Sequence, residues 1–171
     1  MYHQYREGYI EVICGCMFAG KTEELIRRIN VLSYAKQKIL VFKPKIDDRY
    51  SEIEIASHSG RKVPCFAIDD PEEILDKVTD DVQVVAIDEV QFFNSKIVDV
   101  CEYLADKGVR VMVAGLDKDF RGEPFGVLPE LLTRAEFVTK LTAVCAKCGA
   151  PATRTQRLVD GKPASFDDPV V

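Results

Sequence analysis

Residues 15–22, Gly-Cys-Met-Phe-Ala-Gly-Lys-Thr, fit the phosphate-loop pattern G-x-x-x-x-G-K-[ST] at every fixed position. An apolar run of strand length precedes them at residues 9–14. Residues 23–32 follow, with leucine and isoleucine at helical spacing. A strand, a glycine loop and a helix in this order place a phosphate at a helix N-terminus. The alternative is a glycine turn followed by a chance Lys-Thr pair, and the flanking elements weigh against it. We therefore predict that the loop binds a nucleotide.

The chemistry of a phosphate explains the residue types in the loop. The two glycines let the backbone curl, so that successive N–H groups point at one anion. Lys21 is expected to reach the β- and γ-phosphates, and the Thr22 hydroxyl to help hold Mg²⁺. The predicted phosphate-binding residues here are Gly15, Cys16, Met17, Phe18, Ala19, Gly20, Lys21 and Thr22.

Charge and cysteine usage narrow the class of protein. The chain has 171 residues, which suits one domain with a small appendage, and its net charge is −5. That balance argues against broad binding to nucleic acids or anionic membranes. No run is long enough to span a membrane, and the N-terminus lacks the apolar core of a signal peptide. Six cysteines without a regular framework suit a reducing compartment, so we expect a cytoplasmic protein.

Apolar strand candidates alternate with helical patterns, which predicts an α/β fold with a mostly parallel sheet flanked by helices. Asp70 and Pro71 are typical of a helix start. Residues 45–61 are expected to form either a functional loop or a disordered one. Strands are predicted at 9–14, 38–42, 82–87 and 109–114, a short strand at 63–68, and helices at 21–35, from 70, from 94 or 95 to 107, and at 129–134.

The predicted strand at 82–87 ends abruptly in two carboxylates, Asp88 and Glu89. In phosphate-loop proteins such a strand lies near the loop strand and delivers an acid to the Mg²⁺ site. We expect Asp88 to hold Mg²⁺, and Glu89 to face a substrate as a general base. The alternative is that both residues only end a strand and cap a turn, and the nearby phosphate loop favours the functional interpretation.

Several segments together resemble one known family. They are the phosphate loop, the runs Asp88-Glu89-Val90-Gln91-Phe92-Phe93 and Leu116-Asp117-x-x-Phe120-Arg121-x-x-Pro124-Phe125, and Lys140-Leu141-Thr142-Ala143-Val144-Cys145-x-x-Cys148. Two shorter segments, Asp47-Asp48-Arg49-Tyr50 and Ser57-His58, fit as well. Over nearly the whole chain the sequence is similar to thymidine kinase of the type II, zinc-bearing family.

The resemblance implies a P-loop NTPase fold of the RecA-like kind. It also implies transfer of the γ-phosphate of ATP to the 5′-hydroxyl of thymidine, with Mg²⁺ held by Thr22 and Asp88 and with Glu89 as the base. On the ATP side it adds Asp47, Arg49 and Gln91. On the nucleoside side it adds Met17, Phe92, Leu116, Phe120, Phe125, Thr155 and Val171. By residue type alone, Phe92, Leu116 and Phe125 are more typical of the hydrophobic core than of a binding site. Only their positions in the segments that resemble the family favour the nucleoside pocket.

Cys145 and Cys148 have the spacing of one half of a four-ligand zinc site. A redox pair is the alternative, although Cys145 does not sit between a strand and a helix as a thioredoxin-like motif requires. In the resembled family a second ligand pair completes a structural zinc site, and this sequence ends at Val171 before such a pair. We expect zinc in the complete protein, a catalytic domain at 1–141 and a small zinc-binding and substrate-loop domain at 142–171.

The resemblance further implies a homotetramer and inhibition by thymidine triphosphate. The acidic charge balance predicts no nucleic-acid or membrane partner. Two other functions remain open from the residues. One is a phosphate-loop ATPase of the strand-exchange or helicase type, which needs a positive nucleic-acid surface. The other is a non-catalytic nucleotide-binding module. The sequence does not decide between thymidine and deoxyuridine as the preferred nucleoside.

Overall fold

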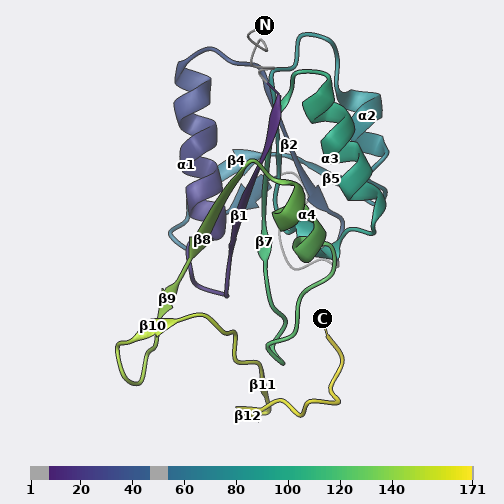
Figure 1. Ribbon diagram of the computed structural model, residues 1–171. Helices are drawn as coiled ribbons and strands as arrows, with labels where there is room; N and C mark the ends of the chain where they lie inside the picture. The colour runs from purple at the N-terminus through teal and green to yellow at the C-terminus, as the bar shows by residue number, and fades with distance from the viewer. Residues whose placement is uncertain (1–7, 47–53, 171) are drawn as a thin grey trace, which may run out of the picture.

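The computed structural model describes residues 8–46 and 54–170, and in them six parallel strands form one central sheet. The strand order is β5-β2-β6-β7-β1-β8 (Figure 1). The predicted phosphate-loop strand is β1, and the strand that ends in two carboxylates is β6. One strand, β7, separates them. The strands of this sheet are β1 (Tyr9–Gly15), β2 (Ile39–Pro44), β5 (Phe66–Ile68), β6 (Val84–Ile87), β7 (Arg110–Leu116) and β8 (Phe137–Leu141).

Helices cover both faces of the sheet, which gives three layers (Figure 1). Helix α1 lies on one face, and α2, α3 and α4 lie on the other. Their bounds are α1 (Lys21–Tyr34), α2 (Glu73–Lys77), α3 (Lys96–Asp106) and α4 (Leu128–Arg134), with a short 3₁₀ turn, η1 (Val90–Phe92), after β6. This arrangement confirms the predicted α/β fold with a parallel sheet.

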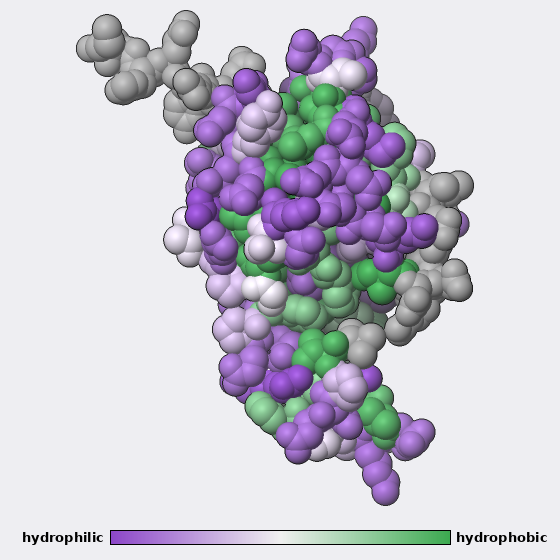
Figure 2. Space-filling view, turned by 90° about the vertical axis from the view of Figure 1, so that its right-hand side faces the viewer, coloured by the Kyte–Doolittle hydropathy of each residue, from purple (hydrophilic) through white to green (hydrophobic). Residues whose placement is uncertain are grey.

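Alternation along the strands divides the core in two, because successive side chains of a strand point to opposite faces. On β7, Val111 and Val113 pack toward α3, whereas Met112 and Ala114 pack toward α1. Both faces of the central strands are covered, so these strands read as continuous apolar runs. The polar surface that α2 and α3 present is seen in Figure 2, with apolar side chains showing between the hydrophilic ones.

The C-terminal segment has little regular structure and extends beyond the carboxyl ends of the strands (Figure 1). It contains two small hairpins. One pairs β9 (Ala143–Val144) with β10 (Pro151–Ala152), and the other pairs β11 (Leu158–Val159) with β12 (Lys162–Pro163). The proposed division of the chain at residues 141 and 142 stays a prediction.

The structure corrects four details of the predicted elements. Strand β2 extends to Pro44, two residues past the predicted end at residue 42. Residues 63–68 form two strands and not one: β4 (Lys62–Pro64) pairs with β3 (Glu54–Ala56), and β5 joins the central sheet. Helix α2 begins at Glu73, after a turn in which Asp70 Oδ1 accepts the Glu72 N–H at 2.9 Å.

The fourth correction is strand β8, which the sequence did not predict. It pairs in parallel with β1 at the edge of the sheet. Part of the predicted loop at 45–61 is β3, and its residues 47–53 lie outside the described ranges. Within the described part of the chain, none of the helices has the length and hydropathy to cross a membrane.

Candidate active site

The predicted phosphate loop connects β1 directly to α1. Gly20 takes the left-handed conformation, with φ 87°, which glycine adopts without steric cost. Its carbonyl accepts the Glu24 N–H at 2.9 Å and so starts the helix. Within the bend, the Ala19 N–H donates to the Cys16 carbonyl at 3.3 Å. The loop therefore has the compact turn, followed by a helix N-terminus, that the motif predicts.

Two side chains at the start of α1 reach inward from the loop. The Lys21 ammonium donates to the Cys16 carbonyl at 2.7 Å, which folds it back over the loop. The Thr22 hydroxyl donates to Asp88 Oδ2 at 2.9 Å. Because Asp88 follows β6, this contact joins the loop to the tip of a strand that is not its neighbour in the sheet.

The carboxylates at the tip of β6 lie in a charged and mostly buried environment. Asp88 is buried, and burial, followed by repulsion from Glu89, raises the pKa of Asp88 to about 7. Burial also lowers the pKa of Lys21, while the nearby Glu89 and Asp88 carboxylates oppose that shift. A cation placed beside Asp88 would relieve the repulsion between the two acids.

Thr22 and Asp88 together suit Mg²⁺. This ion prefers hard oxygen ligands and is commonly held by one or two carboxylates, substrate phosphates and water. A hydroxyl and a carboxylate 2.9 Å apart beside a phosphate loop provide the protein's share of such a set.

Glu89 is held in an uncommon backbone conformation. Its φ of 51° and ψ of 38° are left-handed, which non-glycine residues rarely adopt. Its Oε2 accepts a hydrogen bond from Gln91 Nε2 at 2.6 Å, and Gln91 Oε1 accepts the Leu116 N–H at 3.2 Å. Buried Gln91 thus fixes Glu89 to the end of β7. Strained residues held by their surroundings in this way are frequent at active sites.

Close packing explains the glycine at the end of β7. A Cβ atom on Gly115 would lie 2.7 Å from Gln91 Oε1 and 2.9 Å from Val90 Cγ1. A larger residue would therefore displace the amide that holds Glu89. Gln91 was predicted on the ATP side, and the structure places it between Glu89 and the predicted nucleoside residue Leu116.

The remaining predicted nucleoside residues lie in separate contacts. Phe92 and Phe125 meet edge to face, with ring centroids 5.6 Å apart. Phe120 lies under the guanidinium groups of Arg121 and Arg157, at 5.5 and 5.6 Å.

Met17 joins the phosphate loop to the C-terminal segment, because its N–H donates to Thr155 Oγ1 at 3.0 Å. The predicted residues Asp47, Arg49 and Val171 lie outside the described ranges.

A contact to the phosphate loop that the sequence did not reveal comes from the β3–β4 hairpin. The His58 ring packs against Phe18, with centroids 4.8 Å apart, and the Ser59 hydroxyl donates to Glu23 Oε1 at 3.0 Å. Phe18 has a left-handed φ of 64° and an exposed side chain. The only available signal was the resemblance of the Ser57-His58 segment to the family, and it assigned no role.

A second missed residue is Asp117, just beyond the end of β7. Its buried carboxylate forms an ion pair with Lys140 of β8, Oδ2 to Nζ 2.9 Å. Strand β1 lies between β7 and β8, so the pair spans the strand that leads into the phosphate loop. No spacing in the sequence links these two residues, and their partnership follows only from the strand order.

Cys145 and Cys148 lie in the turn between β9 and β10. The Cys145 N–H donates to the Ala150 carbonyl at 2.8 Å, and the Gly149 N–H donates to the Cys145 carbonyl at 2.9 Å. Hydrogen bonds from the backbone amides of Cys148 and Lys147 lower the pKa of Cys145. Among the described residues no three His, Cys, Asp or Glu side chains gather as a metal site, so a zinc site at this pair stays a prediction.

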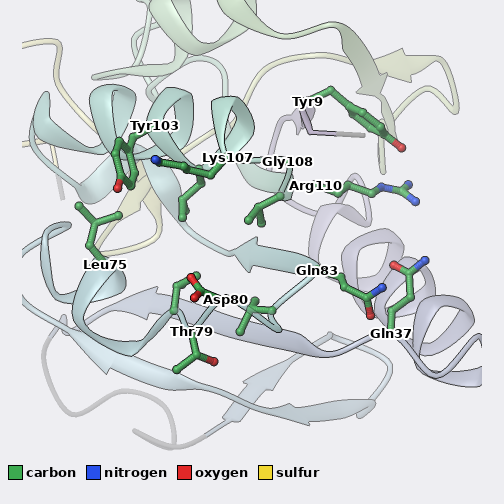
Figure 3. Close-up of a pocket in the computed structure, with 14 residues that line it drawn as sticks. Tyr9, Gln37, Leu75, Thr79, Asp80, Gln83, Tyr103, Lys107, Gly108 and Arg110 are labelled. Carbon is green, nitrogen blue, oxygen red and sulfur yellow. The ribbon is translucent and has the colours of Figure 1, made fainter. Parts of the chain in front are cut away.

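A cavity of about 860 Å³ lies at the opposite edge of the sheet (Figure 3). Tyr9 and Arg110, at the amino ends of β1 and β7, line it together with Lys107 and Tyr103 of the α3 end. In open parallel sheets, ligands bind at the carboxyl ends of the strands. The candidate active site is therefore the phosphate-loop edge and not this cavity.

The comparison with protein families fits this site. Residues 8–166 match the family described as thymidine kinase. Two solved structures are similar at low identity. The ATPase DotB of Legionella pneumophila has 13% identity and a TM-score of 0.45, over 75% of this chain and 34% of that one. Domain III of the replication initiation protein DnaA of Thermotoga maritima has 16% identity and a TM-score of 0.45, over 82% of this chain and 57% of that one. Because its family match spans nearly all of its residues, the chain belongs to the thymidine kinase family.

Proposed function

We propose that the protein transfers the γ-phosphate of ATP to the 5′-hydroxyl of thymidine, giving thymidine monophosphate and ADP. Family membership supports the reaction and the nucleoside. The observation that carries the proposal is the hydrogen bond between Thr22 and Asp88, since it brings the phosphate loop and the acidic tip of β6 into one site. ATP as the donor follows from the triphosphate-binding loop at the start of α1.

The transfer is a displacement at the γ-phosphorus. The 5′-oxygen of thymidine forms the new bond, the bond to the β,γ-bridging oxygen breaks, and ADP leaves with that electron pair. Glu89 accepts the proton of the 5′-hydroxyl. Lys21 neutralises charge on the transferring group, and the loop amides hold the β-phosphate. When bound by Thr22 and Asp88, Mg²⁺ supplies further positive charge to the phosphates.

The rate of such a transfer depends mainly on positioning, because little covalent chemistry falls to the protein. Gln91 supports this requirement through its hydrogen bond to Glu89, whose backbone is left-handed. The aromatic pair Phe92 and Phe125, and Leu116 at the end of β7, supply apolar surface suited to a base.

The direct test is a nucleoside phosphorylation assay on the whole protein, with radiolabelled ATP and a panel of nucleosides. We expect Mg²⁺-dependent label transfer to thymidine, and the deoxyuridine arm measures the selectivity between the two bases. Label released as inorganic phosphate and stimulated by DNA in a salt-sensitive manner would instead indicate a nucleic-acid ATPase. Binding of ATP without any transfer would indicate a non-catalytic module.

Family membership also supports four secondary proposals. These are a homotetramer, inhibition by thymidine triphosphate at the same site, a cytoplasmic location, and a structural zinc ion to which Cys145 and Cys148 contribute. Zinc takes no part in the proposed transfer. Light scattering and total metal analysis on the protein used in the assay test the assembly and the zinc content.

A further inference from the structure

Two consecutive residues of the phosphate loop are hydrogen-bonded to the C-terminal segment. The Cys16 thiol, which is buried, donates to the Ala152 carbonyl at 3.2 Å. The Met17 N–H donates to Thr155 Oγ1 at 3.0 Å. More than 130 residues separate the partners in each case, by sequence differences of 136 and 138. The C-terminal segment therefore packs directly against the phosphate loop at Cys16 and Met17.

These contacts close a ring of hydrogen-bonded elements. Ala152 lies on β10, which pairs with β9, and β9 follows β8 after one residue. Strand β8 pairs with β1, which runs directly into the loop. The 152–155 segment is thus linked to the phosphate loop twice, directly at Cys16 and Met17 and indirectly through β9, β8 and β1.

We propose that Thr155 is a positioning residue for the phosphate loop, so that nucleotide affinity depends on its hydroxyl and the nucleoside and nucleotide sites are coupled. The inference rests on the proposed function for the identity of the two ligands. Its physical basis is the contact to Met17. The N–H of Met17 is fixed by Thr155, whereas its half-exposed side chain belongs to the predicted nucleoside pocket.

The threonine hydroxyl has the capacity for both roles. It carries one donor and two acceptor lone pairs. Accepting the Met17 N–H leaves its O–H free to donate to a ligand. A nucleoside that orders the 152–155 segment thereby reduces the entropy that the loop must lose when the triphosphate binds. Such coupling is reciprocal, so the nucleotide favours nucleoside binding by the same factor.

Two substitutions separate this role from a contact with the base alone. Thr155→Val keeps the shape of the side chain and removes the hydroxyl. Thr155→Ser keeps the hydroxyl and removes the methyl group. If Thr155 positions the loop, only the valine variant weakens nucleotide binding in the absence of nucleoside. If Thr155 contacts only the base, neither variant changes it.

The measurement is calorimetric titration of the whole protein with Mg²⁺ and a non-hydrolysable ATP analogue, without thymidine. We expect Thr155→Val to raise the Kd about three- to tenfold, as loss of one neutral hydrogen bond implies, and Thr155→Ser to stay within about twofold. Thr133→Val is the matched control, because the Thr133 hydroxyl donates to the Pro129 carbonyl within the distant α4. A Kd for Thr155→Val equal to that of the wild type overturns the proposal.

The same titration repeated with saturating thymidine measures the coupling. We expect thymidine to lower the Kd in the wild type and to lower it less in Thr155→Val. A Kd in the wild type that is equal or higher with thymidine than without it overturns the coupling. The first titration requires no turnover, so a loop effect without thymidine phosphorylation would refute the proposed function alone, and phosphorylation without a loop effect would refute this inference alone.

Discussion

Thr22 Oγ1 and Asp88 Oδ2 lie 2.9 Å apart, although β1, which leads to the loop before Thr22, and β6, which precedes Asp88, are separated in the sheet by β7. The contact explains how a parallel sheet produces this site: the carboxyl ends of its strands share one edge, and side chains from different strands meet there. Lys21 and Asp88 accordingly belong to the same site, with Glu89 beside them.

Replacing Thr22 with valine tests the oxygen pair as a Mg²⁺ site. Removing the hydroxyl deletes the Mg²⁺ ligand proposed above and its hydrogen bond to Asp88. We expect Mg²⁺-ATP to bind about tenfold more weakly, the size expected for a hydrogen bond to a charged group. Thr22→Ser should bind as the wild type does. In excess EDTA the difference between Thr22→Val and the wild type should vanish, and its persistence would argue against a metal role.

Gln91→Leu tests the positioning of Glu89. The change removes the amide that holds Glu89 Oε2 and leaves the Leu116 N–H unpaired. We expect kcat to fall about tenfold or more with little change in the KM for ATP, since a misplaced base affects the chemical step. Gln83→Leu is the control, because Gln83 accepts the Lys38 N–H at the other end of the sheet. Equal kcat values for both variants would contradict the account.

Glu11→Gln tests a buried ion network behind α1. The Glu11 carboxylate pairs with both Arg28 and Arg110, and its side chain is 9% exposed. The change removes the anion that pairs with Arg110 and one of the two anions that pair with Arg28, which keeps Glu24. We expect the free energy of unfolding to fall by about 2 kcal/mol, less than for a fully buried pair because both arginines keep some exposure. The exposed Glu130, paired with Arg134, is the control, and Glu130→Gln should cost under about 0.5 kcal/mol in the same urea titration.

Glu24 gives a prediction for acid stability. Hydrogen bonds from Arg27, and then from Arg28, lower its pKa from 4.5 to about 2. A depressed pKa in the folded state means that the charged form contributes stability above pH 4.5, and that this contribution is lost as the pH falls toward 2. Because the site faces solvent, we expect about 1 kcal/mol at most. Urea titrations across this range should show a shallower loss for Glu24→Gln, and parallel curves would refute the pairing.

Much of the fold follows from local sequence. Buried parallel strands such as β6 and β7 read as apolar runs because helices cover both of their faces. Strand β8 does not, since it lies at the edge with Phe137 and Val138 half exposed and gains its strand character from pairing with β1, more than 100 residues away. The division of residues 63–68 between two sheets has the same cause, because each half pairs with a different distant segment.

The sequence predicts those parts of the candidate site that belong to a motif, but not the contacts that only the folded chain creates. The spacing and residue types of the phosphate loop predict phosphate binding, and the two carboxylates Asp88 and Glu89 at the end of an apolar strand predict an acidic group beside it. Asp117 and Lys140 carry no such signal, because their partnership depends on β1 lying between their strands. The positive φ of Glu89, and the Gln91 amide that holds it, likewise follow from tertiary packing and have no local signature.

Glu89→Gln tests the central claim most directly. Glutamine keeps the shape of the side chain and cannot accept the proton of the 5′-hydroxyl. In single-turnover transfer of phosphate from ATP to thymidine, we expect the rate to fall by about 10²- to 10⁴-fold, the usual contribution of a general base. The Kd of a non-hydrolysable ATP analogue should stay within about twofold of the wild type. An unchanged transfer rate would contradict the role given to Glu89 and, with it, the proposed mechanism.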